Sequence, residues 1–322
     1  MKTVSLVIPL YNEESVVERF YAELTASIDP LGYDFEIIFV NDGSKDGTQL
    51  KLESLARQDE RLGIIELSRN FGHQAALCAG LENANGDFVI TMDGDGQHPP
   101  TLITEMLALA ESGYDIVMTQ RVDSGKESWF KRSTSGLFYR LLNKISDTNT
   151  LPGGADFRLI SRQVLENLLG MPEYHRFLRG MISWLGFRSV ILPFTTAPRL
   201  AGESKYSLKK MFRLASDAVF SFSLAPLYIG MSVGVVFLFL ALFEAIYVLS
   251  FWVSGRSHLL APGWSSLMFM LLIVAGVLMI LLGFIGVYVG YIFQEVKNRP
   301  VFVIKSKYLG SGKVETEGEE EI

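Results

Sequence analysis

Hydrophobic and amphipathic segments alternate along residues 1–204. Short runs rich in β-branched residues are typical of buried strands, and they occupy residues 3–8, 35–40, 63–67, 88–92 and 115–119. Helical periodicity falls between them, over residues 14–28, 48–58, 73–83 and 102–111. We expect Asn12 to cap the first of these helices, and Pro99 and Pro100 to begin the last. The alternation predicts an α/β domain whose mostly parallel sheet is covered by helices on both faces.

Two later segments, residues 227–253 and 266–293, are long and almost continuously apolar. Each exceeds the about 20 residues that cross the hydrocarbon core of a bilayer, so we predict a two-helix transmembrane hairpin. Glu244 is the one charged residue of the first segment, and it serves either a function or a contact between helices. Small residues of the second segment favour close helix packing and a homo-oligomer: Ala275, Gly276, Gly283, Gly286 and Gly290.

Lysine and arginine residues flank both apolar segments on the side away from the hairpin tip. They are Lys205, Lys209, Lys210 and Arg213 before the first segment, and Lys297, Arg299, Lys305 and Lys307 after the second. The connection 254–265 contains only Arg256. Because positive residues favour the cytoplasmic side, we predict that both termini are cytoplasmic. The apolar run at residues 3–8 is too short for a signal peptide.

Two further segments, residues 129–145 and 207–222, combine an apolar stripe with basic residues. Basic amphipathic helices next to a membrane span are typical of the membrane interface, and packing within the domain is the alternative. The predicted organisation is a soluble domain, an interfacial helix, two spans and a cytoplasmic tail, at residues 1–204, 205–223, 224–254, 265–293 and 294–322.

The composition agrees with a soluble part joined to a spanning part, since 49% of the residues are hydrophobic and 20% are charged. A net charge of −6 argues against nucleic acid as a partner. Cys78 is the single cysteine, which excludes an intrachain disulfide and a cysteine-based zinc cluster.

The clearest candidate chemistry lies directly after the fourth predicted strand, at Asp93-Gly94-Asp95. Ligands of α/β domains bind at the carboxyl ends of the strands. Two carboxylates there, with Gln97 as a further oxygen ligand, can bind Mg²⁺ or Mn²⁺ together with substrate phosphate oxygens. Taken alone, the same three residues would form an ordinary turn.

Polar residues also follow the first three strands. Acidic and amide groups after the first and second strands, at Asn12, Glu13 and Asp42, can receive a nucleobase and ribose hydroxyls, and Tyr11 offers a stacking surface. Turn formation is the alternative for Asp42. Arg69, after the third strand, either binds a phosphate or pairs within the structure. No Walker A or G-x-G-x-x-G pattern is present.

Six motifs together carry a family resemblance: VIPLYNEE, VNDGSKDGT, RNFGHQAAL, MDGDGQHPP, GADFRL and RLAGESKYSLKK. They resemble the polyisoprenyl-phosphate glycosyltransferases of glycosyltransferase family 2, which are inverting GT-A enzymes typified by dolichol-phosphate mannose synthase. Bacterial members with two C-terminal spans transfer glucose from UDP-glucose to undecaprenyl phosphate. The resemblance covers the chain from about residue 3 to residue 300 and implies an integral protein of a bacterial-type inner or plasma membrane.

The resemblance implies roles for individual residues. Asp93, Asp95 and Gln97 would form the metal and diphosphate site, and the nucleotide would be held by Pro9, Tyr11, Asn12, Glu13, Asp42 and Arg69. Arg121 would contact the donor or the acceptor phosphate, and Asp156 would lie near the reacting sugar. The segment that closes over the phosphates would contain Arg132, Arg199, Ser204 and Lys205. Members of the family often carry an acidic or hydrophobic residue at the position of Gly94.

These roles imply an inverting hexosyl transfer to a lipid phosphate. A phosphate monoester is already largely ionised at neutral pH, because its second pKa is near about 6. Asp156 is therefore expected to be an orienting group and not an obligatory base. GDP-mannose or a modified UDP-sugar is the alternative donor, and a non-catalytic scaffold or flippase is the alternative class. A processive polysaccharide synthase is disfavoured, because the chain lacks a Gln-x-x-Arg-Trp motif and further spans.

Overall fold

The computed structural model describes residues 1–122, 154–174, 176–195, 225–255, 263–309 and 313–315. Contacts divide the chain into two compact units, Met1–Ser207 with Arg299–Ile322 and Leu208–Asn298. Each unit is described by itself. The predicted segments 129–145 and 207–222 lie outside the described residues.

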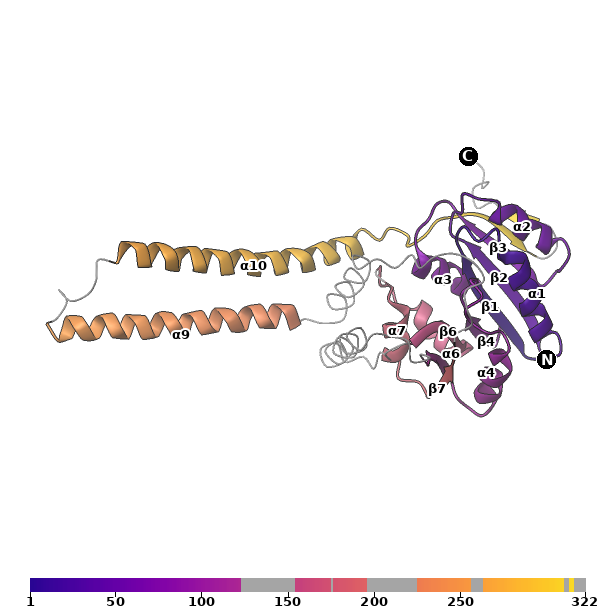
Figure 1. Ribbon diagram of the computed structural model, residues 1–322, viewed down its shortest axis with the longest axis horizontal. Coiled ribbons are helices and arrows are strands. Elements are labelled where there is room, and N and C mark those ends of the chain that lie inside the picture. Colours follow the sequence, from indigo (N-terminus) through magenta and orange to yellow (C-terminus); the bar gives the residue numbers. More distant parts are fainter. Residues whose placement is uncertain (123–153, 175, 196–224, 256–262, 310–312, 316–322) are drawn as a thin grey trace. The chain divides into compact units, whose positions relative to one another are not determined.

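The first unit follows the predicted alternation of strands and helices (Figure 1). Its N-terminal part consists of β1 (Thr3–Leu10), α1 (Val17–Ile28), β2 (Asp34–Asn41), α2 (Thr48–Ala56), β3 (Leu62–Leu67), α3 (His73–Glu82), β4 (Phe88–Thr91), α4 (Leu102–Glu111) and β5 (Ile116–Arg121). The remaining elements are β6 (Gly154–Ser161), α6 (Arg162–Leu169), α7 (Leu178–Trp184), β7 (Ser189–Phe194), β8 (Ile304–Leu309) and β9 (Lys313–Glu315). The five predicted strands and four predicted helices are confirmed, with small differences at their ends.

The strands form one mixed sheet in the order β7-β5-β6-β4-β1-β2-β3-β8-β9. Parallel pairing joins β4, β1, β2 and β3, and also β5 and β7. Antiparallel pairing places β6 between β4 and β5, and adds β8 and β9 beyond β3. The expectation of a mostly parallel sheet is therefore confirmed in part: β1 to β5 and β7 run in one direction, whereas β6 and β8 run against their neighbours and make the sheet mixed. The antiparallel strands β6 and β8 are not among the five strands predicted from the hydrophobic pattern.

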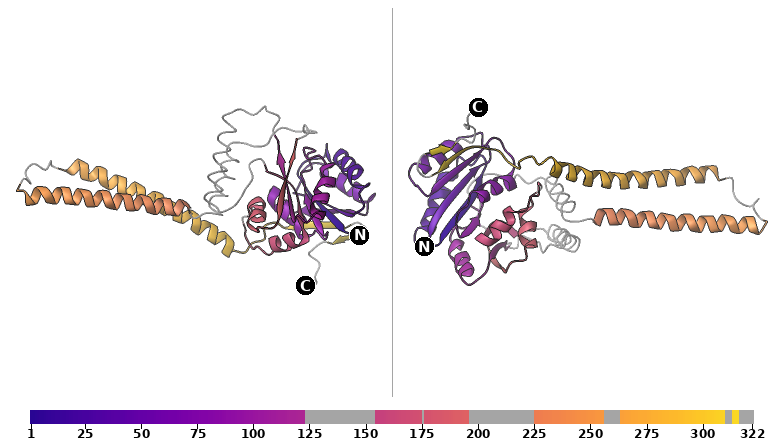
Figure 2. Two further views of the ribbon diagram at one scale, coloured as in Figure 1. Left: turned by 90° about the horizontal axis from the view of Figure 1, so that it is seen from below. Right: turned by 180° about the vertical axis from the view of Figure 1, so that it is seen from behind.

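The central strands are buried on both faces, as continuous hydrophobic runs require. Alternate residues of β1 and β2 join a core with α1, α2 and α4, while the opposite face of these strands packs against α3 (Figure 2). Contact with α3 is close, because a Cβ atom at Gly80 would lie 2.2 Å from Cγ1 of Val7. Glycine at this position therefore brings the helix axis near the sheet.

The segment after the second apolar stretch returns to this sheet. Strand β8 pairs antiparallel with β3, and the carbonyl of Val303 accepts a hydrogen bond of 2.9 Å from the backbone N–H of Ser68. Glu66 of β3 accepts bonds from Lys305 at 2.7 Å and from Ser306 at 2.8 Å. The prediction of a tail over residues 294–322 is therefore wrong for β8, whose alternating lysine residues make it more polar than the buried strands.

The second unit contains α9 (Ala225–Val253) and α10 (Trp264–Val296), of 29 and 33 residues. The two helices lie side by side and antiparallel (Figures 1 and 2), and a Cβ atom at Gly230 would lie 2.3 Å from Cδ2 of Leu281. They coincide with the two predicted apolar segments. Within the described residues, one stretch, Gly276–Val296, has the length and composition to cross a bilayer.

Asn12 does not cap α1. The N-cap position is Val16, which makes no side-chain cap hydrogen bond, and Asn12 has a positive φ of 54° in the loop before it. The side chain of Asn12 instead accepts a hydrogen bond from the backbone N–H of Lys45 at 2.8 Å. Pro99 and Pro100 stand just before α4, where their carbonyls accept bonds from the N–H groups of Leu102 and Ile103.

A polar cluster joins α1 to the start of β3. Asp59 accepts hydrogen bonds from the Tyr21 hydroxyl and from Arg61, whose Nη2 lies 2.8 Å from Oδ2, while Nη1 of Arg61 lies 2.8 Å from Asp29. The hydrogen bonds from Arg61 outweigh partial burial and lower the pKa of Asp59 to about 2. Burial and the neighbouring Asp59 raise the pKa of the Tyr21 hydroxyl.

We predict that Asp59→Asn destabilises the protein by about 2 kcal/mol at pH 7. A carboxylate whose pKa is depressed on folding contributes stability above its unfolded pKa of 3.8, and this stability is lost as the pH falls toward about 2. The free energy of unfolding of the purified, detergent-solubilised chain should therefore differ between wild type and variant at pH 7, and the difference should shrink as the pH falls from about 4 and be lost below about 2. Asp34→Asn, at an exposed residue, is the control. A difference that stays constant with pH would contradict this account.

Candidate functional site

The candidate site is built at the carboxyl ends of the central parallel strands. Loops follow β1, β2, β3 and β4 at this edge and carry most of the described predicted residues, while Pro9, Arg121 and Asp156 lie in β1, β5 and β6. Parallel strands direct these loops to one side of the sheet, so segments far apart in the sequence come together there.

Hydrogen bonds join the loops after β1 and β2 to each other. The N–H of Asn12 donates to the Ser44 hydroxyl at 2.9 Å, and the N–H of Glu13 donates to the Thr48 hydroxyl at 3.0 Å. Tyr11 and Glu13 are partly exposed at this edge, whereas Pro9 is a buried residue of β1.

Asp42 fixes the loop that follows β3. Its carboxylate accepts hydrogen bonds from the N–H groups of Phe71 at 2.7 Å and Gly72 at 3.0 Å. Gly43 has a φ of +63°, and a Cβ atom there would lie 2.4 Å from the backbone of Arg69, so the two loops touch only because this residue is glycine. Burial raises the pKa of Asp42 despite these two bonds. The guanidinium of Arg69 lies 4.3 Å from the centre of the Phe71 ring, as in cation–π pairs.

The segment Asp93-Gly94-Asp95 after β4, called the acidic loop below, takes its shape from its glycine. A Cβ atom at Gly94 would lie 2.3 Å from Cδ2 of Leu10, so the residue between the two aspartates packs directly on β1. Asp93 and Asp95 are both partly exposed, and Oδ1 of Asp95 accepts a bond from the N–H of Gln97 at 3.0 Å. The amide oxygen of Gln97 accepts a bond of 3.3 Å from Arg121 at the end of β5.

His98 holds this loop from the interior. Its Nδ1 accepts the N–H of Asp93 at 3.0 Å, and its ring stacks on Phe157 with the ring centres 5.2 Å apart. The side chain is 1% exposed. Burial lowers the pKa of His98, which agrees with a neutral ring accepting a backbone proton. His98 therefore sets the conformation of the acidic loop.

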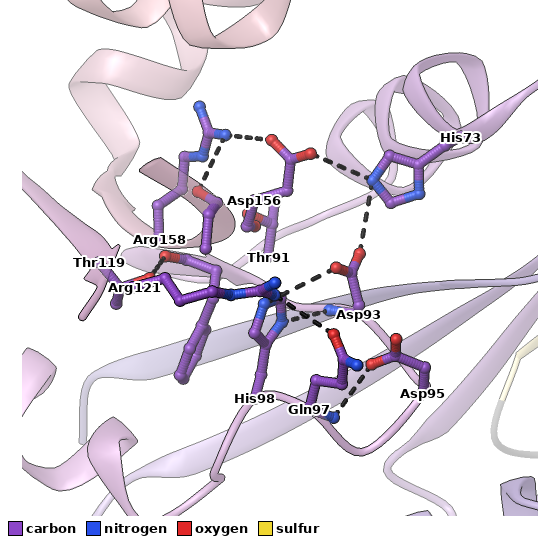
Figure 3. A network of polar contacts seen from close by, with 12 residues as sticks. His73, Thr91, Asp93, Asp95, Gln97, His98, Thr119, Arg121, Asp156 and Arg158 are labelled. Carbon is purple, nitrogen blue, oxygen red and sulfur yellow. Dashed lines mark hydrogen bonds and ion pairs between the residues drawn. The ribbon is translucent and has the colours of Figure 1, made fainter. Parts of the chain in front are cut away.

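Asp156 is the centre of a polar network next to the acidic loop (Figure 3). Its side chain is 8% exposed and contacts Arg158 of the same strand, while Arg179 of α7 donates to both carboxylate oxygens at 2.9 Å. The Thr91 hydroxyl donates to the backbone carbonyl of Asp156 at 2.6 Å. Burial by itself would raise the pKa of this carboxyl, but the charges of Arg179 and Arg158 outweigh burial and hold the pKa well below the usual range.

His73, the first residue of α3, bridges Asp156 and the acidic loop. Its Nε2 lies 3.4 Å from an oxygen of Asp93 and 3.4 Å from an oxygen of Asp156 (Figure 3). The side chain is 43% exposed. Burial lowers the pKa of His73, but the hydrogen bond to Asp156 and the charges of both aspartates outweigh it, so the pKa is raised.

The donor set of the acidic loop fits a small divalent ion that also binds phosphate. Asp93, Asp95 and Gln97 offer two carboxylates and one amide oxygen within five residues. In the described part of the chain, no group of three His, Cys, Asp or Glu side chains is placed to hold an ion by itself. Mg²⁺ and Mn²⁺ need only one or two carboxylates, since water and phosphate oxygens complete their shell.

The structure brings together most of the residues singled out in the sequence. Arg132, Arg199, Ser204 and Lys205 lie outside the described residues, and their roles stay predictions. Four residues of the network were not singled out as site residues: His73, His98, Arg158 and Arg179. The first two stand in strand-end motifs, which is a usable signal, whereas Arg179 lies 23 residues from Asp156 in the chain and has no local signal.

The comparisons with known proteins identify the family. The model of Glycosyl transferase family 2 matches residues 5–169. An uncharacterized glycosyltransferase of Bacillus subtilis, YkcC, is 38% identical over 94% of this chain and 94% of that protein. The bactoprenol glucosyl transferase of Shigella phage SfII is 37% identical over 96% of this chain and 99% of that protein.

A solved structure shares the fold of the first unit. The mannosyl-3-phosphoglycerate synthase of Rubrobacter xylanophilus superposes with a TM-score of 0.50 at 20% sequence identity, over 67% of this chain and 71% of that one. This likeness shows the fold alone. The family model and the relatives show that the chain belongs to glycosyltransferase family 2 and is a glycosyltransferase, and the mixed sheet and the likeness to the solved structure support the GT-A α/β fold.

Proposed function

We propose that this enzyme transfers a hexosyl group from a nucleotide sugar to a polyisoprenyl phosphate, with inversion at the anomeric carbon. UDP-glucose is the favoured donor and undecaprenyl phosphate the favoured acceptor. The observation that carries the proposal is similarity over nearly the whole chain to bactoprenol glucosyl transferases, including the C-terminal apolar helices. Asp93 and Asp95 at the strand ends support nucleotide-sugar chemistry and weigh against a non-catalytic scaffold or flippase.

The acidic loop would bind the donor diphosphate through a metal. Asp93, Asp95 and Gln97 would hold Mg²⁺ or Mn²⁺, which when bound stabilises negative charge on the departing nucleoside diphosphate. Arg121, whose guanidinium contacts Gln97 at 3.3 Å, would add positive charge on the same side. The loops containing Tyr11, Asn12, Glu13, Asp42 and Arg69 would hold the nucleotide.

The transfer itself is a single displacement. A phosphate oxygen of the acceptor forms a bond to the anomeric carbon while the bond to the diphosphate breaks on the opposite face of the sugar. The acceptor is already ionised, so no strong base is required. Asp156 would orient the reacting groups, because two arginines and His73 engage its carboxylate and hold its pKa well below the usual range. A carboxylate so stabilised is a weak base.

The enzyme would work at the cytoplasmic face of the membrane. α9 and α10 would form a two-span hairpin that anchors the catalytic unit next to its lipid acceptor, because each exceeds the about 20 residues that a span requires. Among the described atoms, none lies within 4 Å of a Cβ built at Gly276, Gly283, Gly286 or Gly290. This open face of α10 supports packing against a second copy of the chain.

We predict that membranes containing the protein, supplied with undecaprenyl phosphate and Mn²⁺, transfer label from UDP-[¹⁴C]glucose into a lipid extract. Parallel reactions with GDP-[¹⁴C]mannose and other UDP-sugars test the alternative donors. Transfer from another donor alone would exclude glucose. If every donor failed with a polyisoprenyl phosphate but glucose reached a different acceptor, the lipid would be excluded.

Asp95→Ala is expected to lower the rate of transfer by at least about 100-fold, since it removes one of the two carboxylates that would hold the metal, and the metal stabilises the departing diphosphate. Initial rates measured across a Mn²⁺ titration would show a higher metal requirement for any residual activity. Asp34→Ala makes the same change at the exposed start of β2, away from the site, and should keep the wild-type rate. Undiminished transfer by Asp95→Ala would remove the metal-site proposal.

The two-span topology predicts opposite labelling at the two ends of the hairpin. Cys78 is 1% exposed, so the natural chain gives a low background with a membrane-impermeant maleimide. Ser254→Cys, after α9, should react in intact spheroplasts, whereas Lys297→Cys, after α10, should react only after permeabilisation. Equal labelling of both positions in intact spheroplasts would contradict the topology.

A further inference from the structure

Arg179, in helix α7, forms two hydrogen bonds to the buried carboxylate of Asp156 in strand β6. Its Nε donates to Oδ1 and its Nη2 donates to Oδ2, each at 2.9 Å. Two parallel hydrogen bonds from a planar guanidinium fix the plane of a carboxylate as well as its position. A single charged contact would not do this, because the carboxylate could still rotate about its bond to Cβ.

Two arginines supply positive charge to the Asp156 carboxylate, and they differ in the geometry of their contacts. Arg158, two residues along β6, already contacts the same carboxylate, and its side chain is 6% exposed. Arg179 is 29% exposed and reaches Asp156 from α7, whose Leu178, Met181 and Ile182 are buried. The buried residues anchor the helix by packing, and the helix thereby holds Arg179 against Asp156. The additional effect of Arg179 is orientation.

The orientation of Asp156 extends to the acidic loop. The oxygen Oδ2 that Arg179 contacts at 2.9 Å also faces Nε2 of His73 at 3.4 Å, and the same nitrogen faces Asp93 at 3.4 Å. Rotating the carboxylate of Asp156 would move Oδ2 away from Nε2 of His73 and weaken the contact between them. Arg179 on α7, Asp156 on β6, His73 on α3 and Asp93 after β4 thus form a continuous chain of polar contacts.

We propose that Arg179 is a positioning residue for sugar transfer: it fixes the plane of the Asp156 carboxylate and, through His73, the arrangement of the acidic loop. The inference rests on the function proposed above. Misplacing groups around a reacting centre by about 1 Å can lower a rate about 100-fold without a matching loss of substrate binding. The expected signature is therefore a loss in kcat with little change in the donor KM.

The test compares Arg179→Lys and Arg179→Gln with wild type, using initial rates of transfer into lipid extract at varied donor concentration. We expect kcat to fall about 10-fold for the lysine variant, which keeps the charge but cannot make two parallel bonds, and about 100-fold for the glutamine variant. Arg176→Lys is the matched control. Arg176 pairs with Glu82 of α3 at 2.8 Å instead of with Asp156, so the kcat of this variant should equal that of wild type.

A double-mutant cycle distinguishes positioning through Asp156 from an independent effect. If Arg179 acts through Asp156, then Arg179→Gln lowers the rate of an Asp156→Asn enzyme by less than about 3-fold, although it lowers the wild-type rate about 100-fold. Full additivity of the two changes would overturn the proposal. Equal kcat values for wild type and both Arg179 variants would overturn it as well.

The pH profile gives a further readout that a merely structural role would not move. His73 from α3, Arg158 from β6 and Arg179 from α7 face the Asp156 carboxylate, and the charge of Arg179 is foremost among the contributions that lower its pKa. Without that charge, the remaining positive groups offset less of the effect of burial, which raises the pKa, so the pKa of Asp156 rises. Activity of Arg179→Gln should therefore fall off at a higher pH than that of wild type on the acidic side. Superimposable profiles would count against the proposal.

Two controls separate failure of this inference from other failures. Thermal unfolding of each detergent-solubilised variant shows whether that variant is folded. If the glutamine variant is not folded, the test uses the lysine variant, which keeps the charge. If wild type makes no lipid-linked sugar with any donor, the proposed function fails. If wild type is active and the Arg179 variants match it, only the positioning role fails.

Discussion

The site depends most on the buried, ionised carboxylate of Asp156, whose side chain is 8% exposed. Removing a charge from water costs several kcal/mol unless partners replace the lost hydration. Here Arg158 comes from the same strand, Arg179 from α7 and His73 from α3. One side chain therefore joins three elements, and these elements must pack correctly before the carboxylate can be buried.

Strand β6, which carries Asp156, is held in the sheet by both of its neighbours. This strand is inserted antiparallel between β4 and β5, and hydroxyl groups of both neighbours donate to its carbonyls. Thr91 of β4 donates to Asp156 and Thr119 of β5 donates to Phe157, both at 2.6 Å. Phe157 in turn stacks on His98, which holds the N–H of Asp93. The strand that carries Asp156 thus also supports the acidic loop.

The site has two sides with different kinds of organisation. Toward β2 and β3, loops hold one another through backbone groups, as Asp42 does with the N–H groups of Phe71 and Gly72. Toward β6 and α7, charged side chains contact one another directly. Strand β8 extends the first side, because it pairs with β3 directly before the loop that Asp42 holds. The first arrangement suits a nucleotide, and the second suits a site where charge develops during transfer.

The sequence by itself determined the central α/β alternation, the apolar helices and the acidic loop at the end of β4. Each depends on spacing within a short segment, so a local pattern is sufficient. The place of β6 and β8 and the partners of Asp156 were decided by the tertiary structure. The role of Arg179 could not be predicted from the sequence, because it pairs with a residue 23 positions away and such pairs produce no periodic pattern. Burial of a charge is a property of the whole assembled domain, and only the assembled domain shows which cations stabilise it.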